Sequence, residues 1–154
     1  MRRRMKIKIF CFLAVAVLIM CGCTDKDGTT EKVPTLINVT LEDENSVEIA
    51  VDDNGWIPLK DDTRIHVQFK GDVDYIFFYL TPRGTETFSQ RELVGVASAY
   101  DNDSTGEKGF GIGKTTVQYK WNVPDKSFDG VLGIELMSGT VARYEGNVAD
   151  VINR

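Results

Sequence analysis

The stretch from Asp72 to Leu80 constrains the fold of this chain most, because it is a run of aromatic and β-branched residues with turn-forming residues on both sides. Such a run is typical of a β-strand. Since a strand sends successive side chains to opposite faces, one face should carry Ile76, Phe78 and Leu80 and the other Tyr75, Phe77 and Tyr79. Both faces of this predicted strand are apolar, so it belongs in the middle of a sheet.

Short runs of the same kind recur along the rest of the chain and are separated by turn signals. Asp52 to Gly55 supplies a tight turn, Thr81 to Gly84 a second one, and Trp56 to Leu59 a loop. The further predicted strands are 36–41, 46–51, 63–70, 93–100, 116–124, 131–137 and 141–152. No stretch of useful length has a helical period, so the pattern predicts an all-β fold, an antiparallel β-sandwich of about seven to eight strands.

The N-terminus has the composition of an export signal. Residues 1–8 are basic, and the twelve residues from Ile9 to Met20 are apolar. Twelve helical residues reach only about 18 Å, whereas the hydrocarbon core of a bilayer is roughly 30 Å thick. We therefore interpret this segment as a secretion signal and not as a membrane-spanning helix.

The signal ends in Met20-Cys21-Gly22-Cys23, which resembles the processing box of bacterial lipoproteins. The resemblance implies that Cys23, which follows a small residue, receives a lipid such as palmitate and becomes the mature N-terminus, with Cys21 as the alternative. An ordinary secreted protein with two incidental cysteines is the other interpretation. We expect a signal peptide at 1–22, a lipidated cysteine and flexible linker at 23–33, and a globular domain at 34–154. The protein would then be anchored to the cell membrane by its lipid and face the extracytoplasmic side.

Charge restricts the partners of the mature domain. Loss of residues 1–22 removes five of the 18 basic residues and none of the 23 acidic ones, which leaves a net charge near −10. A negative field disfavours binding of nucleic acid or of an anionic membrane through the folded part. Membrane attachment would therefore depend on the lipid.

Several segments of residues 34–153 resemble bacterial immunoglobulin-like domains of the cell surface. They are Gly-Asp-Val-Asp, Tyr-Ile-Phe-Phe-Tyr-Leu, Thr-Pro-Arg-Gly-Thr, Leu-Val-Gly-Val, Tyr-Lys-Trp-Asn-Val-Pro and Asp-Gly-Val-Leu-Gly-Ile-Glu-Leu, in that order. The resemblance implies an immunoglobulin-like β-sandwich. The chain lacks a cysteine pair across the sheets and a tryptophan in the central strand, so it departs from antibody domains.

The aromatic face of the central strand is the main candidate binding face. Tyr75, Phe77 and Tyr79 would form a row of rings about 7 Å apart, suited to a sugar, a peptide or a partner protein of the envelope. Alternatively, a neighbouring strand or the long polar loop at 101–114 covers these rings as a second small core. The sequence alone leaves both alternatives open.

The chain offers little for catalysis, for a cofactor or for a metal. His66 is the only histidine, and no nucleophile elbow or pair of histidine ligands accompanies it. Asp101, Asp103 and Thr105 imitate the start of a calcium loop with glycine at the sixth place, but Ile112 stands where such a loop needs glutamate. We expect a non-catalytic binding, adhesion or structural module; the alternatives are an assembly lipoprotein of an envelope complex and a carbohydrate-acting accessory protein.

Overall fold

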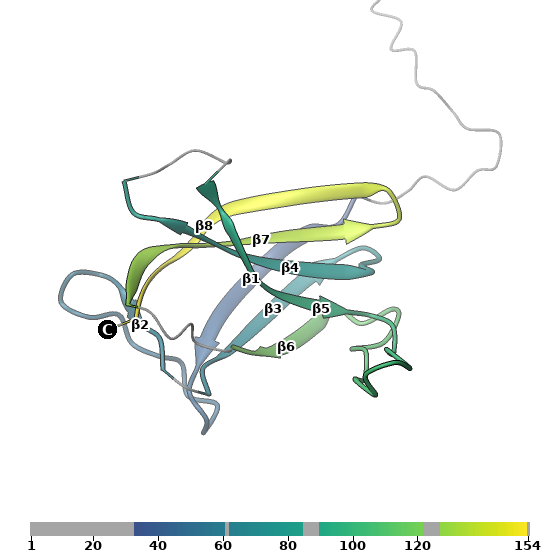
Figure 1. Cartoon of the computed structure of the whole chain (residues 1–154), viewed down its shortest axis with the longest axis horizontal. Coiled ribbons are helices and arrows are strands. Elements are labelled where there is room, and N and C mark those ends of the chain that lie inside the picture. The colour runs from purple at the N-terminus through teal and green to yellow at the C-terminus, as the bar shows by residue number, and fades with distance from the viewer. Residues whose placement is uncertain (1–32, 61, 85–89, 122–126, 154) are drawn as a thin grey trace, which may run out of the picture. The chain divides into compact units, whose positions relative to one another are not determined.

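A computed structural model describes residues 33–60, 62–84, 90–121 and 127–153 of the chain (Figure 1). The expected signal peptide, both candidate lipidation sites at Cys21 and Cys23, and nearly all of the expected linker lie outside these residues. Eight strands are present in the described part. They are β1 (Thr35–Glu42), β2 (Ile57–Pro58), β3 (Arg64–Lys70), β4 (Tyr75–Pro82), β5 (Glu92–Ser98), β6 (Thr116–Lys120), β7 (Phe128–Ser138) and β8 (Val141–Asn153).

The strands form two sheets, which confirms the predicted all-β sandwich. One sheet has the strand order β1-β3-β6 and the other β2-β8-β7-β4-β5. Figure 1 shows β4 between β7 and β5, as its two apolar faces require. β6 is the end strand of the three-stranded sheet and β5 is the end strand of the five-stranded sheet. Residues of both strands line one groove, so these two ends lie on the same side of the domain.

The core lies between the two sheets and follows the period-two pattern of the sequence. Along β3, Ile65, Val67 and Phe69 are buried and alternate with polar side chains. The five-stranded sheet contributes buried residues from β4 and β7, which are Ile76, Phe78, Leu80, Leu132, Ile134 and Leu136. Contacts among these residues unite both sheets in one hydrophobic cluster. This burial is the main source of stability, since the described residues include no cysteine.

Two expectations about individual segments are wrong. Residues 46–51 form no strand, because Asp43 and Asp52 cap local turns on either side, and only Glu48 makes an isolated bridge, to Glu42. The predicted loop at 56–59 contains β2, which pairs parallel with β8 through Ile57 and Val151. The sandwich is therefore antiparallel in every pairing of the described strands except this one.

Among the described residues, no helix has the length and apolar character needed to cross a bilayer.

Candidate functional site

The central strand β4 divides its side chains as the sequence predicts. Ile76 and Phe78 are fully buried, and Leu80 nearly so, on the face toward the three-stranded sheet. Tyr75, Phe77 and Tyr79 lie on the opposite, outer face and are each partly buried. The candidate binding face is thus neither bare nor sealed, and its two ends differ.

The end of this face at Tyr79 is closed by a stack of side chains. The Arg91 guanidinium lies 4.1 Å from the centre of the Tyr79 ring and 4.5 Å from that of Tyr144. Arg91 also forms an ion pair of 3.3 Å with Glu135. Burial, and next the Glu135 carboxylate, raise the pKa of the Tyr79 hydroxyl. Tyr79 therefore belongs to a small outer cluster with Arg91 and Tyr144.

The other end of the face, at Tyr75, is open and carries more rings. The Tyr75 ring stacks on Phe77 with 6.0 Å between centroids and lies 6.1 Å from the ring of Tyr100. Tyr100 follows β5 and is 46% exposed. Tyr75 and Tyr100 thus form a pair of accessible rings at the edge of the five-stranded sheet.

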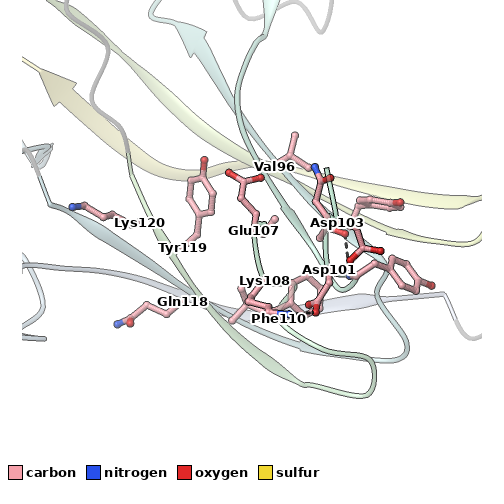
Figure 2. A pocket seen from close by; sticks show the side chains of 15 residues that line it. Val96, Asp101, Asp103, Glu107, Lys108, Phe110, Gln118, Tyr119 and Lys120 are labelled. Carbon is pink, nitrogen blue, oxygen red and sulfur yellow. Dashed lines mark hydrogen bonds and ion pairs between the residues drawn. The ribbon is translucent and has the colours of Figure 1, made fainter. Parts of the chain in front are cut away.

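These two tyrosines border a groove of about 900 Å³ between the end strands of the two sheets (Figure 2). The groove is partly open to solvent. β5 contributes Val96, Ala97 and Ser98, and β6 contributes residues from Val117 to Lys120. The loop after β5 forms the remaining wall, with Asp101, Asn102, Asp103, Glu107, Lys108 and Phe110. We call this site the β5–β6 groove.

Tyr119 links the two sheets at the floor of the groove. Its ring stacks on Phe78 at a centroid distance of 4.4 Å, and its hydroxyl hydrogen-bonds with the backbone of Val96. The Tyr119 ring can occupy this place only because residue 95 is glycine, since a Cβ at Gly95 would overlap the Tyr119 hydroxyl. Burial raises the pKa of Tyr119, and Glu107 raises it further, while the Val96 hydrogen bond opposes them. Figure 2 shows Tyr119 projecting from β6 opposite to Gln118 and Lys120.

The loop wall is held to β5 by backbone hydrogen bonds. The Phe110 amide donates to the Ser98 carbonyl at 2.9 Å, and the Gly111 amide donates to the Ala99 carbonyl at 3.1 Å. The Phe110 ring packs edge-on against Phe69 of the core. The polar loop therefore forms one wall of the groove and is held in place by these backbone hydrogen bonds and by the Phe110–Phe69 contact.

The three candidate calcium ligands lie along this loop, and two of them, Asp101 and Thr105, have protein partners. One Asp101 oxygen accepts from Lys108 at 2.6 Å and the other from the Gly109 amide at 2.9 Å. Thr105 donates its hydroxyl proton to Glu107. Among the described residues, no group of three or more His, Cys, Asp or Glu side chains could hold a metal ion.

Asp74 positions Tyr100 at the rim of the groove. The Tyr100 hydroxyl donates to Asp74 Oδ1 at 2.6 Å, and the Gly139 amide donates to Oδ2 at 2.7 Å. Both hydrogen bonds lower the pKa of Asp74, and the bond from Gly139 has the larger effect. The hydrogen bond between Tyr100 and Asp74 raises the pKa of Tyr100. The carboxylate thus connects the start of β4, the end of β5 and the β7–β8 turn.

His66 lies on β3 of the three-stranded sheet, where it pairs with Gln118 of β6, and it is not among the described residues that line the groove. Its Nδ1 is 3.4 Å from Glu42 on the outer face of β3. The backbone register places this side chain between Thr40 and Gln118. These neighbours are polar side chains on the outer face of the three-stranded sheet, as is typical of a solvated surface.

No protein-family model, curated protein or solved structure matches this chain.

Sequence reasoning identified Tyr75 and the loop but missed that they share a groove. It also missed Tyr100 and Gly95. The contact of Tyr119 with Gly95 joins residues 24 positions apart. A glycine inside a strand pattern was the available signal, since such a glycine often marks a close approach.

Proposed function

We propose that this protein is a lipid-anchored, extracytoplasmic recognition module that binds an elongated ligand in the β5–β6 groove without transforming it. One observation carries the proposal: Tyr75 of the aromatic face and the polar loop after β5, two features that the sequence singled out separately, border the same open groove. Exposed rings beside polar side chains suit a ligand with apolar and hydrogen-bonding surfaces.

The chemistry of the groove favours binding over catalysis. Among its described lining residues, Lys108 is occupied by Asp101 and Lys120 by Asp62, and Tyr119 is fixed by Val96. Nucleophilic catalysis needs a nucleophile within hydrogen-bond reach of a base, and the histidine of the chain is on the outer face of β3. The remaining side chains can offer hydrogen bonds, charge and ring surfaces to a ligand.

The anchor is proposed from residues 1–23 of the sequence and is tested by labelling. Cells that express the wild-type chain should incorporate radiolabelled palmitate into it, and Cys23→Ala should abolish the label. Cys21→Ala is the matched control and should retain it. Label that survives Cys23→Ala but not Cys21→Ala would move the anchor to Cys21, and no label in the wild type would exclude the lipoprotein assignment.

Binding is tested with the full chain, purified in detergent, on a glycan array and on an array of short unstructured peptides. The ligands it retains should bind at least about tenfold more weakly to Tyr100→Ala, which removes a ring from the rim. Leu93→Ala is the matched control, because the Leu93 side chain is exposed, like that of Tyr100, but lies on β5 outside the groove. Absence of any ligand, or equal binding by the two variants and the wild type, would refute the proposed function.

A second candidate function is assembly with an envelope protein through the outer face of the five-stranded sheet. Leu93 and Val96 are 51% and 42% exposed there, beside Tyr79 and Phe77. An apolar surface of this kind is a candidate protein contact. If it is one, in-cell crosslinking should join the chain to a defined envelope protein, and Leu93→Lys should abolish that product. Crosslinking that yields the monomer alone would count against this function.

A further inference from the structure

The direction of the backbone groups along β6 can be derived from its pairing with β3. The Phe69 amide donates to the Thr115 carbonyl, and the Trp121 amide donates to the Thr63 carbonyl. Five further positions are paired between these two contacts. Because backbone groups alternate in direction along a strand, the odd-numbered residues of β6 turn theirs toward β3. The N–H and C=O groups of Thr116, Gln118 and Lys120 consequently point outward.

This outward row is more open than the corresponding edges of β1 and β5. On β1, the segment around Glu48 covers the end of the strand, and the Ile49 amide donates to the Leu41 carbonyl. On β5, the Ser98 carbonyl accepts a hydrogen bond from the Phe110 amide, and the Val96 backbone hydrogen-bonds with the Tyr119 hydroxyl. Within the described ranges, no strand pairs with β6 on its outward side. An unpaired row of this kind is a template for another strand.

The groove beside this row carries uncompensated negative charge. Asp101 is paired with Lys108, and Lys120 is paired with Asp62. Asp103 and Glu107 also line the groove, and neither forms an ion pair within the described residues. These two carboxylates, which have no ion-pair partner among the described residues, favour a ligand with positively charged side chains.

We propose that the β5–β6 groove binds an extended, basic segment of a partner polypeptide, which adds to the three-stranded sheet as an antiparallel strand beside β6. This inference rests on the proposed function and names its ligand. Main-chain hydrogen bonds to Thr116, Gln118 and Lys120 supply affinity, and alternate side chains supply specificity. The antiparallel direction follows the other pairings of this sheet and the slightly greater stability of antiparallel ladders.

The pairing fixes which side chains of the ligand enter the groove. Ligand residues opposite Gln118 exchange backbone hydrogen bonds with it and, like it, direct their side chains to the outer face of the sheet. Ligand residues opposite Val117 and Tyr119 direct theirs into the groove, toward Glu107. The recognised segment should therefore carry lysine or arginine at every second position.

The first test uses the wild-type full chain in detergent and a synthetic peptide of eight residues in which lysine and threonine alternate, with blocked ends. The lysine–threonine peptide should bind to the chain, and a peptide with glutamate in place of lysine should not. With lysines in the groove, the threonine amides face β6, so N-methylation of the threonines should weaken binding at least about tenfold. N-methylation of the lysines should leave binding within about twofold. Any other pattern, including absence of binding, would overturn the inference.

The second test changes the protein. Gln118→Pro removes an outward N–H without removing a bond to β3, as edge positions tolerate, and it should weaken binding at least about tenfold. Gln118→Thr keeps the N–H and should bind clearly more tightly than Gln118→Pro. Glu107→Gln should also weaken binding, with Glu44→Gln, an exposed carboxylate outside the groove, as control. Circular dichroism and thermal unfolding check the fold. Normal peptide binding by Gln118→Pro would contradict the strand pairing.

The two levels of proposal fail separately. If the basic peptide does not bind while another ligand still depends on Tyr100, the inference about strand addition is wrong and the recognition module stands. If no ligand depends on Tyr100, the proposed function itself is wrong.

Discussion

Asp74 shows at the scale of one residue how the rim of the groove depends on charge. Its carboxylate accepts hydrogen bonds from the Tyr100 hydroxyl and the Gly139 amide, and both favour the ionised form. The pKa of Asp74 is thereby lowered from its ordinary value of 3.8. Protonation in acid should weaken both contacts and release Tyr100 from its position beside Tyr75.

Asp74→Asn should make the stability of the domain less sensitive to acid. Since the pKa is lower in the folded than in the unfolded state, the contribution of Asp74 is complete above about pH 4 and is lost as pH falls through the lowered value. At pH 7 the variant should lose about 1–2 kcal/mol of unfolding free energy. Urea unfolding at pH 7 and pH 3 measures this, with Asp72→Asn as the control. An equal loss at both pH values would contradict the prediction.

Gly95 and Tyr119 form the second pair whose coupling can be measured. Gly95→Ala places a methyl group where the Tyr119 hydroxyl lies, so the ring must leave its stack on Phe78. We expect a loss of about 1–3 kcal/mol. Tyr119→Leu removes the obstructed ring, and in that background Gly95→Ala should cost much less. Chemical denaturation of the four proteins of this double-mutant cycle gives the coupling, and additive effects would show that the two residues do not interact.

Residue positions in the strands could be predicted from the sequence, whereas most contacts across the groove could not. Alternation alone puts Ile76, Phe78 and Val117 in the core, because the side-chain period of a strand is two. The contact of Tyr100 with Asp74 spans 26 positions and depends on how β5 leaves the sheet. No local pattern encodes such a distance.

At the scale of elements, glycine marks the irregular points of the five-stranded sheet. The β7–β8 register shifts between Leu132 and Ile134, and Gly133 sits at this shift. The Tyr144 ring covers Gly133 on the outer face of the sheet. On the inner face, the Tyr119 ring covers Gly95, which lies near the register shift between β4 and β5. A ring laid over a glycine replaces the packing that the missing side chain would have given.

Gly133→Ala should therefore destabilise the domain and loosen the Arg91 stack. The new methyl group would overlap the Tyr144 hydroxyl, which must move away from Arg91. We expect a loss of about 1–3 kcal/mol in unfolding free energy. Gly55→Ala is a control for glycine replacement without a clash, although its φ of 82° adds backbone strain. A stability equal to that of the wild type would show that Tyr144 does not require the glycine.

Long strands could be predicted well and short ones poorly. Residues 46–51 alternate like a strand, but Val47 and Val51 are 59% and 60% exposed, and the backbone there is held by turns at Asp43 and Asp52. Local hydrogen bonds thus outweighed the alternating pattern. β2 is two residues long and contains Pro58, so it is too short to produce a pattern of its own.

At the scale of the whole molecule, the two outer faces differ in character. The three-stranded sheet presents polar side chains such as His66, Gln68 and Gln118. The five-stranded sheet presents the rings of Tyr75, Phe77 and Tyr144. The β5–β6 groove lies where these two surfaces meet, which suits a ligand that is apolar on one side and polar on the other.

The folded domain should be indifferent to reductant, because all three cysteines precede residue 24 and the core provides the stability. Trp121 is 2% exposed within the core, whereas Trp56 lies near β2 under Arg83. A single cooperative unit should therefore show the same midpoint by tryptophan fluorescence and by far-ultraviolet circular dichroism. Thermal unfolding of the full chain with and without dithiothreitol checks this. A melting temperature that falls with reductant would mean that a disulfide supports the fold, and separate transitions would mean that the two sheets do not unfold together.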